Sequence, residues 1–213
     1  NELNRALAPH GLLFGPETST QNRAMLGGML GNNSCGSNSI KYGSVRDHIM
    51  EVTALLSDGT KAVFGSLDSV EFALKCMGPD THETRLYQQM RFLLGNEGVR
   101  AEIAFEFPKP SIPRRNTGYA LDMLMDASCF EESSNKSFNF GKLIAGSEGT
   151  LCFVTEIKLH CNTLPPPVIG LLCIHFTSVY DALLATQIAV TYDCYACELI
   201  DRYILDCTER SIE

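Results

Sequence analysis

The spacing of apolar residues in the first half of the chain predicts a hairpin followed by helices. Residues 51–64 hold two apolar runs around Asp58-Gly59, a pattern typical of a β-hairpin. Helical spacing then predicts a helix over residues 66–77 and a second helix that ends at Leu94, before Gly95. The first of these helices carries one apolar face, formed by Val70, Ala73, Leu74 and Met77.

In the second half, an alternating stretch and an apolar run predict strands on either side of three prolines. Residues 151–161 alternate well enough for a strand, and the prolines at 165–167 mark a boundary. Residues 168–176 are apolar and β-branched and predict a strand, which a helix over residues 179–190 follows. Strict alternation would place Cys152, Val154, Glu156, Lys158 and His160 on one side of the first strand, and Phe153, Thr155, Ile157 and Leu159 on the other.

The composition argues against several classes of protein. Among the 213 residues, 45% are hydrophobic and 20% are charged, as in soluble globular proteins. The net charge of -8 and the lack of a Lys/Arg run make nucleic acids and anionic membrane surfaces poor partners. No apolar stretch approaches the ~18 residues of a transmembrane span, and Asn1-Glu2 opens no export signal. We therefore expect a cytoplasmic protein, with a peripheral place at the inner membrane for a longer parent protein as the alternative.

The nine cysteines and five histidines show no arrangement typical of a metal centre or a nucleophilic triad. The odd cysteine count and irregular spacing fit free, buried thiols in a reducing compartment. Cys194-Tyr-Ala-Cys197 is the only CxxC, and a zinc site would need a second Cys/His pair at ligand spacing. No histidine stands in a pattern with Ser, Cys or a carboxylate that suggests nucleophilic catalysis. We expect neither a metal site nor a catalytic base in this chain.

A glycine- and asparagine-rich run over residues 24–43 is the strongest chemical signal. Five of the seventeen residues from Gly27 to Gly43 are glycine, and no carboxylate stands between Glu17 and Asp47. Glycine adopts positive φ without steric cost, so successive N–H groups can point into one concavity. The run therefore predicts one wall of a site for a phosphate-bearing cofactor, and a loop that merely turns is the alternative. Further donors and acceptors come from Asn32, Asn33, Ser34, Ser37, Asn38 and Ser39.

Several motifs in a fixed order give the chain a family resemblance. The glycine-rich run is preceded by Leu13-Phe-Gly-Pro-Glu-Thr-Ser-Thr20 and followed by Asn116-Thr-Gly-Tyr-Ala-Leu121. Lys142-Leu-Ile-Ala-Gly-Ser-Glu-Gly-Thr-Leu151, the most specific element, and Glu198-Leu-Ile-Asp201 come later. Together they resemble the FAD-binding domain of the vanillyl-alcohol oxidase (PCMH) type. Within that group the chain is most similar to the D-lactate, D-2-hydroxyglutarate and glycolate dehydrogenases.

The resemblance implies an α+β fold in two parts. Residues 1–164 would form the second subdomain of the FAD-binding domain, a mainly antiparallel sheet flanked by helices. Residues 165–213 would begin the ferredoxin-like cap, or substrate, domain. The family's pyrophosphate loop would lie upstream and its catalytic histidine motif downstream, so we expect residues 1–213 alone to be inactive.

The same resemblance assigns candidate site residues. Arg114 or Arg115 would hold the substrate carboxylate, with Arg114 favoured, and the Tyr119 hydroxyl would help. A solvated basic pair and a packed tyrosine are the alternatives, as is a turn-stabilising role for the Glu148 carboxylate. The candidate cofactor-binding residues are Pro16, Gly27, Gly28, Asn32, Asn33, Gly36, Tyr42 and Gly43 in the first segment, and Gly146, Glu148, Gly149 and Val154 in the second.

The implied reaction is oxidation of a D-2-hydroxy acid, with hydride transfer to the N5 atom of FAD. The electrons would pass to an acceptor that the sequence does not name. Cys152 departs from the glycine usual in the family, and an insertion around Asn135 resembles larger proteins fused to an iron–sulfur module. These residues hold no iron–sulfur cysteine pattern, so any cluster would lie outside this chain. Another alcohol or sugar substrate and a non-catalytic scaffold remain the alternatives, although the intact glycines favour a working site.

Overall fold

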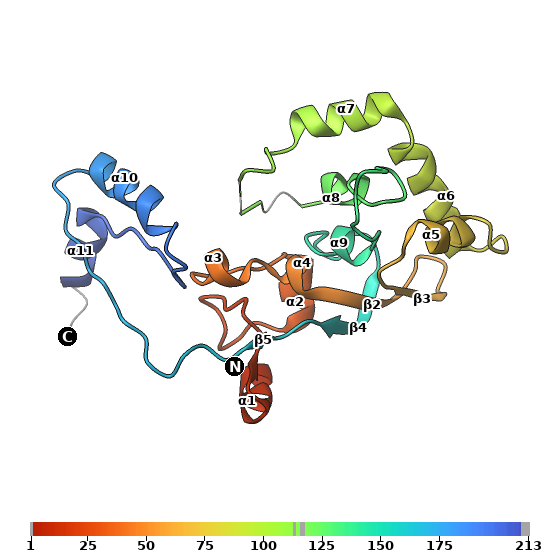
Figure 1. Ribbon diagram of the computed structural model, residues 1–213. Helices are drawn as coiled ribbons and strands as arrows, with labels where there is room; N and C mark the ends of the chain where they lie inside the picture. Colours follow the sequence, from red (N-terminus) through yellow and green to blue (C-terminus); the bar gives the residue numbers. More distant parts are fainter. Residues whose placement is uncertain (1, 113, 116–117, 210–213) are drawn as a thin grey trace.

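A small antiparallel sheet lies at the centre of the fold, in the computed structural model that describes residues 2–112, 114–115 and 118–209 (Figure 1). Its strands run in the order β3-β2-β4, and both outer strands pair antiparallel with β2. Helices surround this sheet, which confirms the α+β class. The strands are β1 (Leu12–Leu13) and β5 (Asn162–Thr163), which form a separate antiparallel pair, and β2 (Ile49–Leu55), β3 (Lys61–Phe64) and β4 (Phe153–Leu159).

Two helices follow the hairpin directly, as the sequence predicts. The helix that ends at Leu94 is α6, and the Thr81 hydroxyl caps it by accepting the Thr84 N–H at 3.1 Å. In the described part of the chain the helices are α1 (Glu2–Leu7), the 3-10 turn η1 (Ala8–His10), α2 (Leu26–Gly31), α3 (Ser39–Tyr42), α4 (Val45–His48), α5 (Ser69–Cys76), α6 (His82–Leu94), α7 (Glu97–Glu106), α8 (Leu121–Met125), α9 (Gly141–Ile144), α10 (Val179–Ala189) and α11 (Arg202–Glu209).

The predicted hairpin of β2 and β3 is confirmed. Val52 pairs with Phe64 and Leu55 with Lys61, so the turn falls at the Asp-Gly pair. Gly59 has a φ of 81°, a conformation that glycine adopts without the penalty of a Cβ. The Asp58 carboxylate accepts hydrogen bonds from the Thr60 N–H at 3.0 Å and hydroxyl at 2.6 Å. Local chemistry is therefore sufficient to set this turn.

The alternation predicted for residues 151–161 is wrong at one point in β4. Thr53 lies opposite Glu156 and Ala54 opposite Val154, so Thr155 is an extra residue in the ladder. The bulge reverses the two faces of the strand, because side chains alternate with a period of two. As a result Val154 and Ile157 both pack against the core, although strict alternation puts them on opposite sides.

Helix α5 buries a different face from the one that its apolar spacing predicts. Val70, Leu74 and Met77 are 66%, 60% and 68% exposed, whereas Phe72 is 3% exposed. The Phe72 ring lies 4.7 Å from the Phe138 ring, within a cluster of aromatic side chains. Phe72 packs against several aromatic rings at once, and these ring contacts add to the area that it buries, which fixes the helix orientation. The cluster consists of Phe64, Phe72, Tyr87, Phe130, Phe138 and Phe140.

Helix α5 begins with a complete capping box, which gives a first testable prediction. The Asp68 carboxylate accepts the N–H groups of Val70 and Glu71, both at 2.8 Å, and Glu71 accepts the Asp68 N–H at 2.9 Å. Asp68→Ala should lower the free energy of unfolding by about 1 kcal/mol, because two helix N–H groups lose their acceptor. Urea unfolding followed by circular dichroism measures this, and the exposed Glu132→Ala, which caps no helix, is the control. Equal losses in the two variants would contradict the role of the cap.

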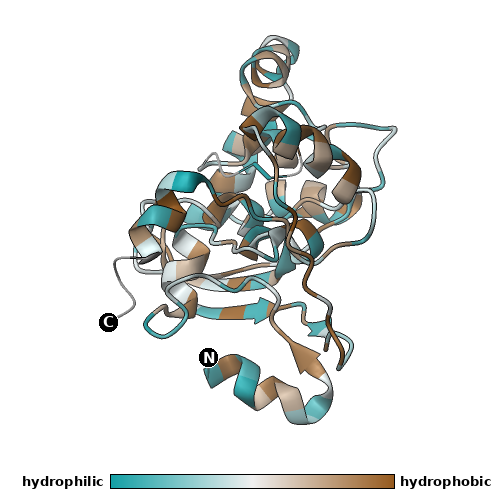
Figure 2. Ribbon diagram, turned by 90° about the vertical axis from the view of Figure 1, so that its left-hand side faces the viewer, coloured by the Kyte–Doolittle hydropathy of each residue, from teal (hydrophilic) through white to brown (hydrophobic). Residues whose placement is uncertain are grey.

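Residues 164–209 lie to one side of the sheet and bury little of their surface (Figure 1). The strand predicted over residues 168–176 is wrong: the segment is extended but pairs with no described strand. An isolated strand has no ladder to stabilise it. The helix predicted over 179–190 is confirmed as α10. An ion pair of 2.5 Å between Lys41 and Asp193 connects this part of the chain to α3. Figure 2 shows the apolar colouring of this exposed part, whose assignment to a ferredoxin-like cap remains a prediction.

Candidate functional site

The two predicted cofactor segments lie side by side, although more than one hundred residues of sequence separate them. The Gly146 N–H donates to the Leu30 carbonyl at 3.0 Å, and the Glu148 N–H donates to the Gly31 carbonyl at 2.9 Å. The C-terminal end of α2 is thus joined to the loop that follows α9. The structure therefore brings the glycine-rich run and the Gly-Ser-Glu-Gly element together at one surface.

Open space beside three glycines fits a large ligand. No heavy atom lies within 4 Å of a Cβ built on Gly27, Gly28 or Gly149. Gly27 and Gly28 stand inside α2, where glycine costs about 0.5–1 kcal/mol relative to alanine. Packing among the described residues does not require glycine at these two positions. This open space beside Gly27 and Gly28, called the cradle below, leaves the backbone accessible and so suits close approach of an anionic cofactor such as FAD.

Three other glycines of the predicted site are required by the fold itself. A Cβ on Gly36 would lie 1.5 Å from the Glu17 carbonyl oxygen. On Gly43, with φ +68°, it would lie 2.5 Å from the Asp47 carboxylate. On Gly146, with φ +87°, it would lie 2.6 Å from the Arg46 guanidinium. These glycines allow close internal contacts, so their presence does not by itself indicate a ligand.

The two adjacent asparagines differ in their surroundings. Asn33 is 2% exposed with a φ of 49°, and its side-chain oxygen accepts the Arg46 N–H at 2.8 Å. Asn32 is exposed, and its amide donates to the Ser34 hydroxyl at 3.0 Å. Asn33 therefore shapes the loop from within, whereas Asn32 stands at the surface where a ligand could reach it.

Glu148 holds an uncommon backbone conformation at this surface. Its φ is 53°, and its side chain is exposed. The carboxylate makes no hydrogen bond to any residue that the structure describes, so a turn-stabilising role has no support. Positive φ in a non-glycine residue costs free energy and is concentrated at binding sites. The free carboxylate is available to a ligand hydroxyl.

The remaining predicted cofactor residues are partly covered. Pro16 is buried, and the Val154 side chain packs against the core. Tyr42 is half-buried, with its ring 5.9 Å from that of Tyr195, and burial raises the pKa of its phenol. A Cβ on Gly15 would lie 2.4 Å from the Tyr42 ring, so these residues pack tightly. Pro16, Tyr42 and Val154 support the site from behind.

Arg46, which sequence reasoning missed, is the hub of the site. It is 3% exposed, and its guanidinium donates to the carbonyls of Lys142 at 2.9 Å, Gly118 at 2.5 Å and Ala145 at 2.5 Å. The Lys142 ammonium donates in return to the Arg46 carbonyl at 2.6 Å. Burial lowers the pKa of both side chains. One arginine thus ties α4 to α9 and to the loop that carries Tyr119.

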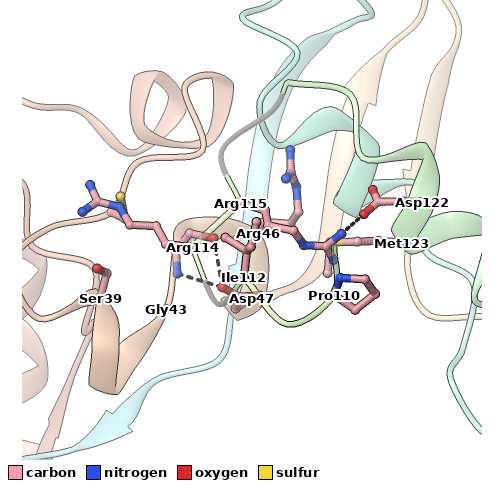
Figure 3. A pocket seen from close by; sticks show the side chains of 12 residues that line it. Ser39, Gly43, Arg46, Asp47, Pro110, Ile112, Arg114, Arg115, Asp122 and Met123 are labelled. Atoms are coloured by element: carbon pink, nitrogen blue, oxygen red, sulfur yellow. Dashed lines mark hydrogen bonds and ion pairs between the residues drawn. The ribbon is translucent and has the colours of Figure 1, made fainter. Parts of the chain in front are cut away.

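A cavity of about 160 Å³ opens between the glycine-rich run and a second group of residues, which consists of Pro110, Ile112, Arg114, Arg115, Asp122 and Met123 (Figure 3). Arg115 pairs there with Asp122, as the dashed line shows, and also donates to the Pro108 carbonyl at 3.3 Å. Within the described ranges, the exposed Arg114 makes no hydrogen bond or ion pair. Of the two predicted arginines, Arg114 is therefore the one with a guanidinium free to bind an anion. The lining also includes Cys35, Ser39, Gly43, Ser44, Arg46 and Asp47.

Tyr119 lies apart from that cavity. Its hydroxyl is 2.6 Å from the Thr150 hydroxyl, which donates to the Ser147 carbonyl at 2.5 Å. Tyr119 therefore borders the Gly146–Gly149 loop, and the structure does not bring it together with Arg114. Two residues of the Asn-Thr-Gly-Tyr element, Asn116 and Thr117, lie outside the described residues.

Cys76 alone among the nine cysteines is fully buried, so the prediction that most of the thiols are buried is wrong. Burial raises the pKa of the Cys129 thiol to about 11 and also raises that of Cys152, so both are protonated at neutral pH. In the described part of the chain, no group of three or more His, Cys, Asp or Glu side chains could hold a metal ion. None of the helices described there is long and apolar enough to cross a membrane.

Comparison with known proteins finds a matching family and several related sequences. Residues 1–65 match the FAD binding domain family. D-2-hydroxyglutarate dehydrogenase of Pseudomonas putida is 32% identical over 206 residues, which cover 96% of this chain and 19% of that protein. The enzyme of the same name from Haemophilus influenzae is 30% identical over 212 residues, covering 100% of this chain and 20% of the relative. D-lactate dehydrogenase of Archaeoglobus fulgidus is 29% identical over 102 residues, covering 48% of this chain and 20% of the relative. The chain therefore spans about a fifth of the length of the two D-2-hydroxyglutarate dehydrogenases.

Proposed function

We propose that this chain, whose residues 1–65 match the FAD binding domain family, is the part of a D-2-hydroxy-acid dehydrogenase that forms one side of the FAD site. The observation that carries the proposal is the open cradle at Gly27 and Gly28. Glycine inside a helix lowers stability, and here no internal contact offsets that cost. A cofactor that needs close approach to the backbone explains both residues.

The roles of the site follow from its exposed groups. Backbone N–H groups near Gly27, Gly28 and Gly149 would face the FAD phosphates, while the Glu148 carboxylate would accept a hydrogen bond from a ribose hydroxyl. Bound FAD would accept hydride from the carbinol carbon of the substrate. Arg114 would bind the substrate carboxylate with its two parallel N–H groups, because Arg115 is already paired with Asp122. The electrons would then pass to an acceptor outside this chain.

The division of the chain is part of the same proposal. We assign residues 1–164 to the second FAD-binding subdomain and residues 165–213 to the start of a substrate domain. The relatives from Pseudomonas putida and Haemophilus influenzae, which match nearly the whole chain and are both named D-2-hydroxyglutarate dehydrogenase, support a 2-hydroxy dicarboxylic acid as the substrate. Anaerobic addition of D-2-hydroxyglutarate to the complete, FAD-loaded protein should bleach its flavin absorbance. Retention of the colour with this acid, D-lactate and glycolate would exclude the proposed substrate class.

The cradle itself can be tested by filling it. Gly27→Ala and Gly28→Ala should each weaken FAD binding to the complete protein at least tenfold, since the new methyl group occupies space next to the cofactor. The thermal midpoint of the apoprotein should stay the same or rise, because alanine favours the helix by about 1 kcal/mol. FAD titration by fluorescence quenching measures the first effect and calorimetry the second.

Gly170→Ala is the matched control for both measurements. Its Cβ also meets no atom within 4 Å, but the residue lies outside the site, so FAD affinity should not change. If Gly27→Ala and Gly28→Ala bind FAD as tightly as the wild-type protein, the cradle does not hold the cofactor.

A further inference from the structure

A buried histidine that the proposed reaction does not use follows the cavity-lining Asp47 in the sequence. His48, the last residue of α4, is 4% exposed. Its Nδ1 atom lies 2.9 Å from the His160 carbonyl oxygen, and its Nε2 atom lies 2.7 Å from the Tyr42 carbonyl oxygen. Both ring nitrogens therefore face backbone acceptors, one on each side of the ring.

The hydrogen-bonding capacity of imidazole restricts the charge of this side chain. A carbonyl oxygen only accepts hydrogen bonds, and neutral imidazole has a single N–H donor. In either neutral tautomer, one ring nitrogen would direct its lone pair at an oxygen less than 3 Å away. The doubly protonated ring donates to both carbonyls and removes that repulsion.

We propose that His48 is held as an imidazolium cation and acts as a positioning residue for the ligand site. It joins the carbonyl of Tyr42, which precedes the cavity-lining Gly43, to the carbonyl of His160 at the end of β4. The cation thereby fixes the turn where the glycine-rich run ends. Its effect on ligand binding rests on the proposed function, whereas its charge state does not.

The groups around His48 make this assignment specific. The Phe14 ring contacts it edge-on with centroids 5.4 Å apart, and the exposed His160 ring stacks at 6.3 Å. On the neighbouring turn, the Tyr42 phenol is held neutral by burial, which raises its pKa, and Lys41 pairs with Asp193. The Asp47 carboxylate, which precedes His48 in the sequence, accepts hydrogen bonds from the Ser44 N–H at 2.8 Å and hydroxyl at 2.9 Å. The two carbonyl oxygens are therefore the direct partners of the cation.

Nitrogen NMR of the complete protein, labelled with ¹⁵N at its histidines, tests the charge state. His48 signals are assigned by difference from His48→Gln. At pH 6.5 we expect both ring nitrogens of His48 to have the chemical shift of a protonated nitrogen. One nitrogen of the unprotonated type would overturn the proposal. His160→Gln is the matched control, because it removes the ring that stacks on His48 and keeps the backbone carbonyl, so the His48 signals should not change.

FAD affinity tests the positioning role. His48→Gln can donate to only one of the two carbonyls, so the FAD affinity of the complete protein should fall at least threefold, at a temperature where circular dichroism shows the variant fully folded. His160→Gln keeps both carbonyl acceptors and should bind FAD like the wild type. Equal FAD affinity in the wild type and in the folded His48→Gln would overturn the positioning role, whereas absence of FAD binding in the wild type would instead refute the proposed function.

Discussion

Replacement of Arg46 with methionine is expected to lower the free energy of unfolding by about 4 kcal/mol. The guanidinium donates to the carbonyls of Lys142, Gly118 and Ala145 and is 3% exposed. Methionine keeps the approximate volume but donates no hydrogen bond, so three carbonyl oxygens lose a charged donor inside the protein. Urea unfolding followed by fluorescence or circular dichroism measures the loss.

A matched control separates this effect from loss of positive charge. Arg85 forms an exposed ion pair with Asp80 at 2.7 Å, and its side chain is 50% exposed. Arg85→Met should cost less than about 1 kcal/mol, as expected for surface ion pairs. A similar small cost for Arg46→Met would mean that water or neighbouring groups satisfy the three carbonyls, and that Arg46 is not the hub of the site.

The elements that sequence predicts well are those determined by neighbouring residues. Asp58-Gly59 sets the turn between β2 and β3, and Thr81 with Gly95 brackets α6. In each case the determining contact spans no more than a few residues. The family motifs worked for a similar reason, because the glycine-rich run and the Gly-Ser-Glu-Gly element each keep a fixed local spacing.

The predictions that are wrong depend on contacts between distant segments. The orientation of α5 follows from Phe72 joining Phe138, a residue more than sixty positions later. The bulge at Thr155 follows from the pairing of β4 with β2, which spacing along β4 alone does not reveal. The segment over residues 168–176 has the composition of a strand, yet a strand also needs a partner. Periodicity reports local preference and cannot supply these partners.

For the candidate site too, the residues that sequence identifies depend on local patterns, and those that it misses depend on contacts between distant segments. Spacing and composition identify Gly27 and Gly28, and sequence favours Arg114 over Arg115 by little, whereas the Arg115–Asp122 pair separates them clearly. Arg46 escaped sequence reasoning because one arginine in a Ser-Val-Arg-Asp turn looks like any solvated side chain. Its hydrogen-bond acceptors are the backbone carbonyls of Gly118, Lys142 and Ala145. Every residue has a backbone carbonyl, so the sequence does not reveal which ones bind Arg46.

Gly36→Ala gives the second large effect, because Gly36 has the opposite surroundings to Gly27. A Cβ on Gly36 would lie 1.5 Å from the Glu17 carbonyl oxygen and 2.6 Å from its carbon. Backbone atoms cannot rotate away as a flexible side chain can, so the two segments must separate. We expect a loss of about 3 kcal/mol in the free energy of unfolding, the upper range for overpacked sites. Urea unfolding of the apoprotein measures it.

The pair Gly36→Ala and Gly27→Ala then separates two reasons for a glycine within one loop. Gly36→Ala should lose stability and, as a consequence, FAD affinity, since the segment around Glu17 no longer supports the glycine-rich run. Gly27→Ala should keep its stability and lose affinity alone. An unchanged unfolding midpoint for Gly36→Ala would show that the loop moves freely away from Glu17. In that event the close approach would not hold the site together, and the cradle at Gly27 and Gly28 would have no rigid support on this side.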